Sequence, residues 1–303
     1  MATVIEADEI DFAAYMRESE PHAKVKPASS YVEEVLKHFA PSEKPRGALL
    51  PWAKTHDDVQ LRPGELSIWA GINGHGKSIL TGQVFLGLVA QGYRSCIASF
   101  EMKPVVTLAR MTRQASGGAT PAPAFIRRFH DWTDDKLWLY DHQGQVAPEQ
   151  ILAVLRYCHD KLRMQHVVID SLMKVVRGED DYNGQKDLLD ILTAHARDTG
   201  MHVHLVHHSK KREDESKAPG KFDLKGSGSI SDQADNVFIV WRNKRKQFDA
   251  QAGQHVDPES PDQLLVVEKQ RNGEFEGRFA LWFHAPSHQY VAGPNAGPLE
   301  FVT

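Results

Sequence analysis

Hydrophobic residues in this chain gather in short runs, and longer stretches with a helical spacing of hydrophobic residues separate most of these runs. Short apolar runs bounded by turn residues predict buried strands, and the longer periodic stretches predict helices. We expect strands at residues 65–70, 94–99, 136–140, 166–170, 202–207, 236–241, 263–268 and 278–283. We expect helices at residues 77–91, 104–116, 148–163 and 184–199.

The order of these elements predicts an α/β fold. Strands that alternate with helices form a parallel sheet with right-handed crossovers, flanked by helices. The last strands are separated only by turns containing glycine and proline, which predicts an antiparallel C-terminal edge. The segment 210–225 is rich in charged residues, proline and glycine, and we interpret it as a long mobile loop between strands.

The first 45 residues differ from the rest, because they are polar and acidic and contain several prolines. Two short helices are expected, Phe12–Met16 and Tyr31–Phe39. The second carries apolar residues at helical spacing, namely Val32, Val35, Leu36 and Phe39. We interpret residues 1–45 as an arm with a linker helix, or a partly disordered tail, and residues 46–303 as one domain.

Composition narrows the functional classes. The net charge of −4 means that any nucleic-acid binding must come from a local basic patch. Two cysteines, Cys96 and Cys158, exclude a disulfide scaffold and a cysteine-rich zinc site, and both are expected to be buried thiols. The acidic N-terminus lacks the pattern of a signal peptide and no apolar run reaches transmembrane length, so we expect a cytoplasmic protein without a membrane partner.

A phosphate-binding loop lies between the first long strand and its helix. Residues 71–78 read Gly71-Ile72-Asn73-Gly74-His75-Gly76-Lys77-Ser78, the complete pattern G-x-x-x-x-G-K-[ST]. The glycines let backbone N–H groups surround a phosphate, and the helix adds the positive end of its dipole. We expect Lys77 to contact the β/γ-phosphates and Ser78 to bind Mg²⁺. The ligand is predicted to be ATP or a deoxynucleoside triphosphate, the alternative being a glycine turn without function.

Three further strands end in polar residues that suit this chemistry. Asp170 ends an apolar strand, and an aspartate there holds Mg²⁺ opposite the P-loop hydroxyl. Glu101 ends a strand that we expect beside the P-loop strand, where a carboxylate can orient the attacking water. His208 ends a third strand, close enough to report loss of the γ-phosphate. The alternatives are helix caps for the two acids and a surface or core role for the histidine.

These motifs resemble, in order, those of the RecA-like motor domain of DnaB-family replicative helicases, including phage and mitochondrial members. Besides the P-loop, the matching segments are Ser99–Pro104, Val167–Leu172, His208, Asp223–Ile230 and Lys269–Gly273. The resemblance covers residues 46–285. Lys225 stands where the family has arginine, and Asp232-Gln233 reverses the family's order. No segment resembles the primase domain or the N-terminal helical domain of family members.

The resemblance implies a hexameric ring with the nucleotide between subunits. Each subunit then offers its neighbour Arg271 as an arginine finger acting in trans, with Lys269 beside it. Physical chemistry supports this role, since an arginine against the γ-phosphate neutralises the charge of the transferring oxygens. The alternative for both residues is ordinary exposed charge on an edge strand.

The resemblance also implies that loops line a channel for single-stranded DNA. The candidate DNA-binding residues are Lys210, Lys211, Arg212, Lys217 and Lys221. Their charges suit sequence-independent phosphate contacts, although acidic residues between them leave a solvated loop as the alternative. A second basic cluster is interpreted as a solvated turn; it contains Arg242, Lys244, Arg245 and Lys246.

The predicted function is an ATP-dependent, ring-forming replicative DNA helicase that moves 5′→3′ on single-stranded DNA. A separate primase or loader is a possible partner, and a phage-encoded protein would act in the host cytoplasm. The main alternative is a RecA-like ATPase that does not unwind DNA, such as a recombination mediator or helicase loader. A third alternative, a metabolic P-loop kinase, is disfavoured. Such an enzyme would need a lid over a small-molecule pocket, and it would not need an arginine from a neighbouring subunit.

Overall fold

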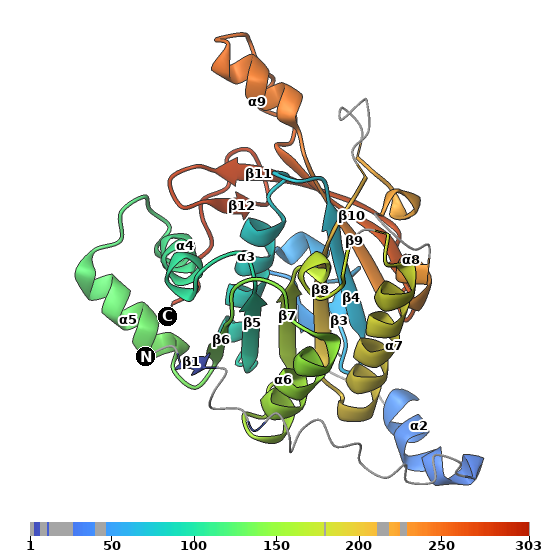
Figure 1. Cartoon of the computed structure of the whole chain (residues 1–303). Coiled ribbons are helices and arrows are strands. Elements are labelled where there is room, and N and C mark those ends of the chain that lie inside the picture. The colour runs from blue at the N-terminus through green and yellow to red at the C-terminus, as the bar shows by residue number, and fades with distance from the viewer. Residues whose placement is uncertain are drawn as a thin grey trace.

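Among the residues that the structure describes, ten strands form one sheet in the order β1-β6-β5-β7-β8-β4-β9-β10-β11-β12 (Figure 1). The structure is a computed structural model that describes residues 3–6, 11, 27–39, 47–178, 180–210, 218–224 and 229–302. Strands β1 to β9 of this sheet pair in parallel, whereas β9, β10, β11 and β12 pair antiparallel. The predicted α/β class with an antiparallel edge is confirmed.

The strands of the large sheet are β1 (Thr3–Glu6), β4 (Leu66–Gly71), β5 (Ser95–Ser99), β6 (Leu137–Asp141), β7 (His166–Asp170), β8 (His202–His208), β9 (Asn236–Arg242), β10 (Gln263–Gln270), β11 (Gly277–His284) and β12 (Gln289–Val291). A small second sheet pairs β2 (Ala48–Leu49) with β3 (Gln60–Leu61). The α-helices are α2 (Val32–Phe39), α3 (Lys77–Ala90), α4 (Pro104–Ser116), α5 (Pro123–Thr133), α6 (Pro148–Asp160), α7 (Tyr182–Thr199), α8 (Ser229–Gln233) and α9 (Lys244–Gln251). Short 3₁₀ helices are η2 (Ala28–Tyr31), η3 (Ala53–Thr55), η4 (Leu172–Lys174) and η5 (Lys221–Asp223).

Two apolar layers enclose the parallel strands, and successive residues of β4 belong to different layers. Ile68 packs in the cluster that contains the buried leucines of α6 and α7. Trp69 packs in the cluster that contains Phe85 of α3 and Met111 of α4. This alternation follows the two-residue period of a strand, and it explains why strands covered on both faces appear as continuous apolar runs.

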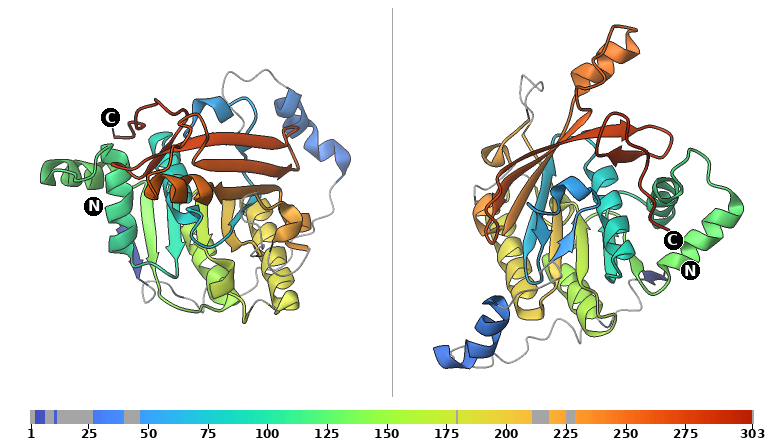
Figure 2. Two further views of the ribbon diagram at one scale, coloured as in Figure 1. Left: turned by 90° about the horizontal axis from the view of Figure 1, so that it is seen from above. Right: turned by 180° about the vertical axis from the view of Figure 1, so that it is seen from behind.

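Within the described residues, the predicted elements agree with the structure, which also contains helices and strands that were not expected. All eight predicted strands, the four central helices and the helix ending at Phe39 are present. Helix α5 was not expected; it begins at Pro123, a residue whose fixed φ suits the first helical position. The basic cluster at Lys244–Lys246 lies on helix α9, so the interpretation as a turn is wrong. Asn243 caps this helix by accepting from the Lys246 N–H, and α9 projects away from the sheet (Figure 2).

The strand order corrects a further expectation. Strand β5, which precedes Glu101, does not lie beside the P-loop strand β4, because β7 and β8 separate them. The neighbours of β4 are β8 and β9. Strand order depends on which distant segments pair, and local hydrophobic patterns carry no information about this choice.

The N-terminal segment adds an unexpected strand to the sheet. Strand β1 pairs in parallel with β6, with Ile5 opposite Tyr140. Helix α2 exposes its apolar residues, and Phe39 is 79% exposed. The predicted helix Phe12–Met16 lies outside the described residues, and the division at residue 45 stays a prediction. Within the described residues, no helix is both long and apolar enough to span a membrane.

Three buried histidines stack inside the sheet. The rings of His202 and His204, both on β8, lie 4.4 Å apart between centroids, and His166 of β7 lies 5.4 Å from each. His204 Nδ1 accepts from the Trp69 indole at 3.1 Å, and its Nε2 lies 3.1 Å from His166 Nδ1. Burial lowers the pKa of all three rings, that of His202 to about 4, so the stack is neutral near pH 7. Among the described residues, no group of three or more His, Cys, Asp or Glu side chains is arranged to hold a metal ion.

Candidate nucleotide-binding site

The P-loop joins the carboxyl end of β4 to the amino end of α3. Gly76 adopts a left-handed φ of +85°, and a Cβ on it would collide with the Tyr290 hydroxyl. A Cβ on Gly71 would collide with the carbonyl oxygen of Val240 on the neighbouring strand β9. The backbone approach therefore requires glycine at both positions, and the loop places the positive end of α3 at the site.

Lys77 is the first residue of α3, and its side chain is buried. The ammonium Nζ donates to the carbonyl oxygens of Gly71 at 2.9 Å and Ile72 at 3.2 Å. The lysine thus folds back along its own loop, with its charge beside the backbone that precedes the helix. In P-loops, the lysine at this first helical position contacts the β- and γ-phosphates, a role that stays a prediction for Lys77.

Ser78 and Asp170 bring the P-loop and strand β7 together. The Ser78 hydroxyl donates to Asp170 Oδ2 at 2.8 Å. Burial raises the pKa of the Asp170 carboxyl, whereas the hydrogen bond from Ser78 lowers it. A hydroxyl and a carboxylate in contact supply the hard oxygen ligands that Mg²⁺ prefers, and protein sites for this ion often hold it through few side chains together with water and phosphate.

A cavity of about 390 Å³ lies over the P-loop at the carboxyl ends of the parallel strands. Its lining residues are Asn73, Gly74, Gly76, Lys77, Ser78, Ile79, Glu101, Arg110, Asp170, His208 and Arg242. Residues predicted from separate stretches of sequence therefore meet at one cavity. Gly71 does not line the cavity; it lies behind it, where its carbonyl holds Lys77.

Glu101 reaches this cavity although β5 is distant from β4 in the sheet. The Phe100 N–H donates to the Asp170 carbonyl at 2.9 Å, which ties the ends of β5 and β7 together. Glu101 is exposed, in contrast to buried Asp170. The two carboxylates thus differ in environment, with a buried one at Ser78 and an accessible one elsewhere on the cavity wall.

Two arginines of the cavity were missed as site residues. Arg110 comes from α4, which starts shortly after Glu101. Arg242 ends β9 and lines the cavity, so its interpretation as part of a solvated turn is wrong. Its N–H donates to His75 Nδ1 at 3.1 Å, and its guanidinium lies 5.6 Å from the centre of the Phe283 ring. Its position at the end of a predicted strand was the available signal for Arg242.

Lys269 and Arg271 do not line this cavity. Lys269 is paired with Val237 near the start of β9, and Arg271 follows two residues later. Lys269 and Arg271 therefore lie at the end of the sheet where the parallel strands begin. The six residues of β4 separate that edge from the P-loop, a distance of about 17 Å. Strand β10 lies between β9 and β11, so the alternative of an edge strand is wrong.

Both cations are attached to the end of helix α8. Lys269 Nζ donates to the carbonyls of Ser231 at 2.8 Å and Asp232 at 2.9 Å. Arg271 Nη2 donates to the Asp232 carbonyl at 3.0 Å, and its Nη1 lies 3.1 Å from Asp235 Oδ1. Burial, together with the charge of Arg271, lowers the pKa of Lys269.

The predicted DNA-binding residues are described only in part. Lys211, Arg212 and Lys217 lie outside the described residues. Lys210 is exposed, and its N–H donates to the Asp223 carbonyl at 2.7 Å beside an antiparallel bridge between Ser209 and Leu224. The described ends of the expected loop are therefore paired, and residues 221–223 form η5.

An exposed aromatic ring lies beside the basic residue of η5. Phe222 is 86% exposed, and Lys221 Nζ lies 5.8 Å from the centre of its ring. The Lys221 N–H donates to Glu268 Oε2 at 3.1 Å, which fixes the segment to β10. Phe222 was missed as a candidate DNA-binding residue, although an aromatic residue among lysines is a signal for single-strand binding.

Residues 58–292 match the family described as the DnaB-like helicase C-terminal domain. The chain belongs to this family. The resemblance inferred from the motifs is thereby confirmed. The cavity over the P-loop lies in the nucleotide-binding domain of a DnaB-like protein.

Individual relatives agree with this assignment. A DNA helicase/primase of Enterobacteria phage T3 is 26% identical to this DnaB-like chain over 237 residues, which covers 71% of the chain and 42% of the relative. The chain thus spans less than half the length of that curated relative.

Two solved structures share the fold. One is described as an ATPase domain; it superposes with a TM-score of 0.71 at 16% identity, covering 89% of this chain and 99% of that one. The other, a DnaB-like replicative helicase studied with its primase interactions, has a TM-score of 0.72 at 16% identity, covering 88% of this chain and 68% of the other. At such low identity these similarities concern the fold alone. They confirm the predicted RecA-like fold of the DnaB-like domain.

Proposed function

We propose that this chain is the motor of a replicative DNA helicase, which hydrolyses ATP or a deoxynucleoside triphosphate with Mg²⁺ and moves 5′→3′ along single-stranded DNA. The observation that carries the proposal is the cavity where Lys77, Ser78, Glu101 and Asp170 meet, in a chain of the DnaB-like family. Family membership does not favour the alternative of a RecA-like ATPase without unwinding activity.

Five residues of the cavity, besides the glycines of the P-loop, have proposed roles in hydrolysis. Lys77 binds the β- and γ-phosphates, and the P-loop glycines present backbone N–H groups to them. Ser78 and Asp170 hold Mg²⁺, whose charge offsets that of the phosphates. Glu101 orients the attacking water, and its accessibility suits this role. His208 senses the γ-phosphate from the end of β8.

We infer that Arg271 and Lys269 act on the nucleotide of a neighbouring subunit. Their separation from the cavity of the same chain, by the length of β4, supports action in trans. A hexameric ring of identical subunits supplies such a neighbour at every site. In the ring, Arg271 neutralises charge on the transferring phosphoryl group and makes hydrolysis depend on the interface.

Helix α2 is the proposed connection between ring subunits. Its apolar residues are exposed, with Leu36 at 58% and Phe39 at 79%. A short helix with an unburied apolar face is unstable alone, and packing against a second copy would bury that face. A separate primase or loader is a further proposed partner, and a phage-encoded protein would act in the host cytoplasm.

Single-stranded DNA is the proposed nucleic acid that the protein binds and moves along. Lys210 and Lys221, with Lys211, Arg212 and Lys217, are proposed to contact its phosphates. Phe222 extends this surface, because an exposed ring anchored through its neighbours can stack on a base of any identity. The combination of cations and one aromatic ring suits movement along DNA without sequence preference.

Strand displacement on forked duplexes tests the proposal. We expect unwinding of a fork with a 5′ single-stranded tail, dependent on ATP and absent with a non-hydrolysable analogue and in Lys77→Ala. A fork with only a 3′ tail should not be unwound. ATPase activity stimulated by single-stranded DNA but without displacement of either fork would identify the non-unwinding alternative.

A mixing experiment tests the action in trans. Arg271→Ala and Lys77→Ala subunits should each be inactive, with a loss on the order of 10³-fold for the finger. Co-purified through two different tags, they form rings in which some interfaces combine an intact P-loop with an intact finger. Recovery of ATPase activity supports the trans role, whereas a finger acting within its own subunit gives no recovery.

A further inference from the structure

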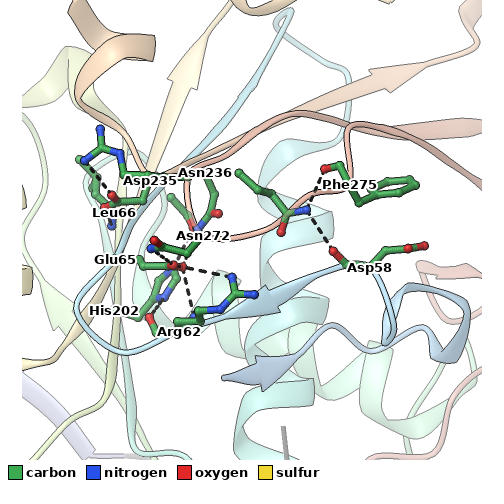
Figure 3. A network of polar contacts seen from close by, with 12 residues as sticks. Asp58, Arg62, Glu65, Leu66, His202, Asp235, Asn236, Asn272 and Phe275 are labelled. Atoms are coloured by element: carbon green, nitrogen blue, oxygen red, sulfur yellow. Dashed lines mark hydrogen bonds and ion pairs between the residues drawn. The ribbon is translucent and has the colours of Figure 1, made fainter. Parts of the chain in front are cut away.

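Two buried carboxylates hold the loop that carries Arg271. Glu65 and Asp235 are each 3% exposed, and both lie where strands β4 and β9 begin (Figure 3). A buried carboxylate is costly unless it is paired and hydrogen-bonded. The partners of these two groups therefore indicate what they stabilise.

Asp235 contacts both the P-loop strand and Arg271. Its Oδ2 accepts from the Leu66 N–H at 2.9 Å, and its own N–H donates to the Leu66 carbonyl at 2.9 Å. Its Oδ1 lies 3.1 Å from Arg271 Nη1, and its carbonyl accepts from the Arg271 N–H at 2.7 Å. The second cation near Oδ1, Arg197, is more distant at 3.9 Å. Both the backbone and the side chain of Asp235 thus join the start of β4 to Arg271.

The residues on either side of Arg271 are also anchored. Gln270 Nε2 donates to the carbonyls of Asp58 at 3.0 Å and Phe275 at 2.8 Å. Asn272 Nδ2 donates to Glu65 Oε1 at 2.8 Å, while Glu65 Oε2 accepts from Asn236 at 2.8 Å. Figure 3 shows Asn236 and Asn272 beside Glu65, and Asp58 and Phe275 in a second group of contacts. The loop at 270–272 is therefore held rigidly against the body of the subunit.

Among the residues that the structure describes, Asp235 alone forms an ion pair with the guanidinium of Arg271. The other acceptors of that guanidinium are the backbone carbonyls of Asp232 and Gln233. The arginine side chain is 38% exposed and has five N–H donors in a rigid fork, so its contacts with Asp235 and α8 leave donors for a further anion. A held but accessible arginine fits a group that must meet a phosphate at a fixed position.

We propose that Asp235 is the positioning residue of Arg271, orienting the finger that each subunit offers to its neighbour. The inference rests on the proposed action of Arg271 in trans. Asp235 is buried and does not line the cavity, so it acts through Arg271, which it orients relative to the P-loop strand. Misplacement of a catalytic group by about 1 Å costs on the order of 10²-fold in rate. We expect a loss of this size when the carboxylate charge is removed.

Asp235→Asn is the test variant, with Asp249→Asn on α9 as a control that removes a carboxylate elsewhere. We expect Asp235→Asn to lower ATPase turnover on the order of 10²-fold. Its affinity for a fluorescent ATP analogue should stay within about twofold of the parent, because its own P-loop is intact. That binding measurement also establishes that the variant is folded. Asp235→Glu, which keeps the charge, should recover part of the turnover.

Complementation between subunits then locates the defect. Rings co-purified from Asp235→Asn and Lys77→Ala subunits should regain activity, because one variant supplies the P-loop and the other the finger. Rings of Asp235→Asn and Arg271→Ala should not, because both variants damage the same finger. Recovery in that second mixture would assign Asp235 to its own P-loop and overturn the proposal.

Two other results would also overturn it. Higher turnover in Asp235→Asn would mean that Asp235 sequesters the arginine instead of orienting it. Absence of recovery between Arg271→Ala and Lys77→Ala would remove the trans finger itself, and the positioning role with it. That result is distinguishable from failure of the positioning role alone, in which the Arg271→Ala and Lys77→Ala mixture still recovers.

Discussion

Ser78 and Asp170 are 92 positions apart in the sequence, and the Ser78 hydroxyl donates a 2.8 Å hydrogen bond to the Asp170 carboxylate. One residue comes from the start of α3 and the other from the end of β7. The packing of these two elements brings the side chains together. The proposed site for Mg²⁺ is thus preorganised by the fold.

Asp170→Asn keeps the shape of this pair and removes its charge. We expect a requirement for Mg²⁺ that is higher by about 10–100-fold, the effect of losing a group that orients a metal site. Since burial raises the pKa of Asp170, its charged form opposes folding near pH 7, and the variant should be no less stable. Magnesium titrations of ATPase activity and thermal melts provide the measurements. Asp141→Asn, at the end of β6, is the control and should leave the titration unchanged.

Glu101→Gln should separate nucleotide binding from hydrolysis. The carboxylate lines the cavity from the end of β5, and its loss leaves the attacking water without a base. We expect nearly normal nucleotide affinity and a turnover lowered about 10²–10⁴-fold. Exposed Glu259 provides the control substitution. Near-normal turnover in Glu101→Gln would assign the base to another residue.

The histidine stack predicts loss of stability in acid. Burial lowers the pKa of His166, His202 and His204 in the folded state, against about 6.5 in the unfolded chain. Unfolding therefore takes up protons below about pH 6.5, and the stack's contribution, complete above that pH, falls as the pH drops towards about 4. Each ring contributes a slope of up to about 1.4 kcal/mol per pH unit.

Urea unfolding at neutral and at mildly acidic pH, about 7 and about 5, measures this slope. His202→Asn removes one titrating ring while keeping a donor for the Arg62 carbonyl, to which His202 Nδ1 bonds at 2.6 Å. We expect the unfolding free energy of this variant to depend less steeply on pH, because unfolding takes up fewer protons, by up to about one. His255→Asn, at an exposed position, should leave the dependence as it was. Equal slopes in all three proteins would contradict the prediction.

Lys210 and Phe222 should affect DNA binding in different ways. Loss of a phosphate contact in Lys210→Ala should reduce the slope of log affinity against log salt by about 0.7. Phe222→Ala should weaken binding by about 1–3 kcal/mol without changing the slope, because stacking releases no counterions. Titrations of fluorescent single-stranded DNA at several salt concentrations distinguish the two effects. Phe248→Ala, which removes an exposed ring from α9, serves as the control.

The exposed face of α2 should determine assembly. Leu36→Ser with Phe39→Ser removes apolar groups that this chain leaves in solvent, so we expect no loss of stability in the isolated subunit. Self-association should weaken while nucleotide affinity is preserved. Sedimentation velocity measures the change, with Tyr182→Ser as a control at another exposed aromatic residue. Unchanged assembly would show that the interface lies elsewhere.

The sequence alone determined most of the central strands and helices and the chemistry of the P-loop site. The P-loop, the strand ending at Asp170 and the strand before Glu101 were all predictable, because hydrophobic periodicity and the polarity of strand ends are local properties. The family followed from the order of such motifs. Helix α9 and the placement of Arg242 were not predicted. A charged stretch is compatible with either a turn or a helix, and the hydrogen bond by which Asn243 caps α9 appears only in the structure.

Only the tertiary structure decided which residues meet and which do not. It separates β5 from β4 by two strands and yet brings Glu101 to the cavity, and it adds Arg110 from α4. It also places Arg271 at the opposite end of the parallel strands from its own P-loop, in an ion pair with Asp235. These relationships depend on strand order and on pairing between distant segments, which are fixed by the packing of the whole sheet and not by any local pattern.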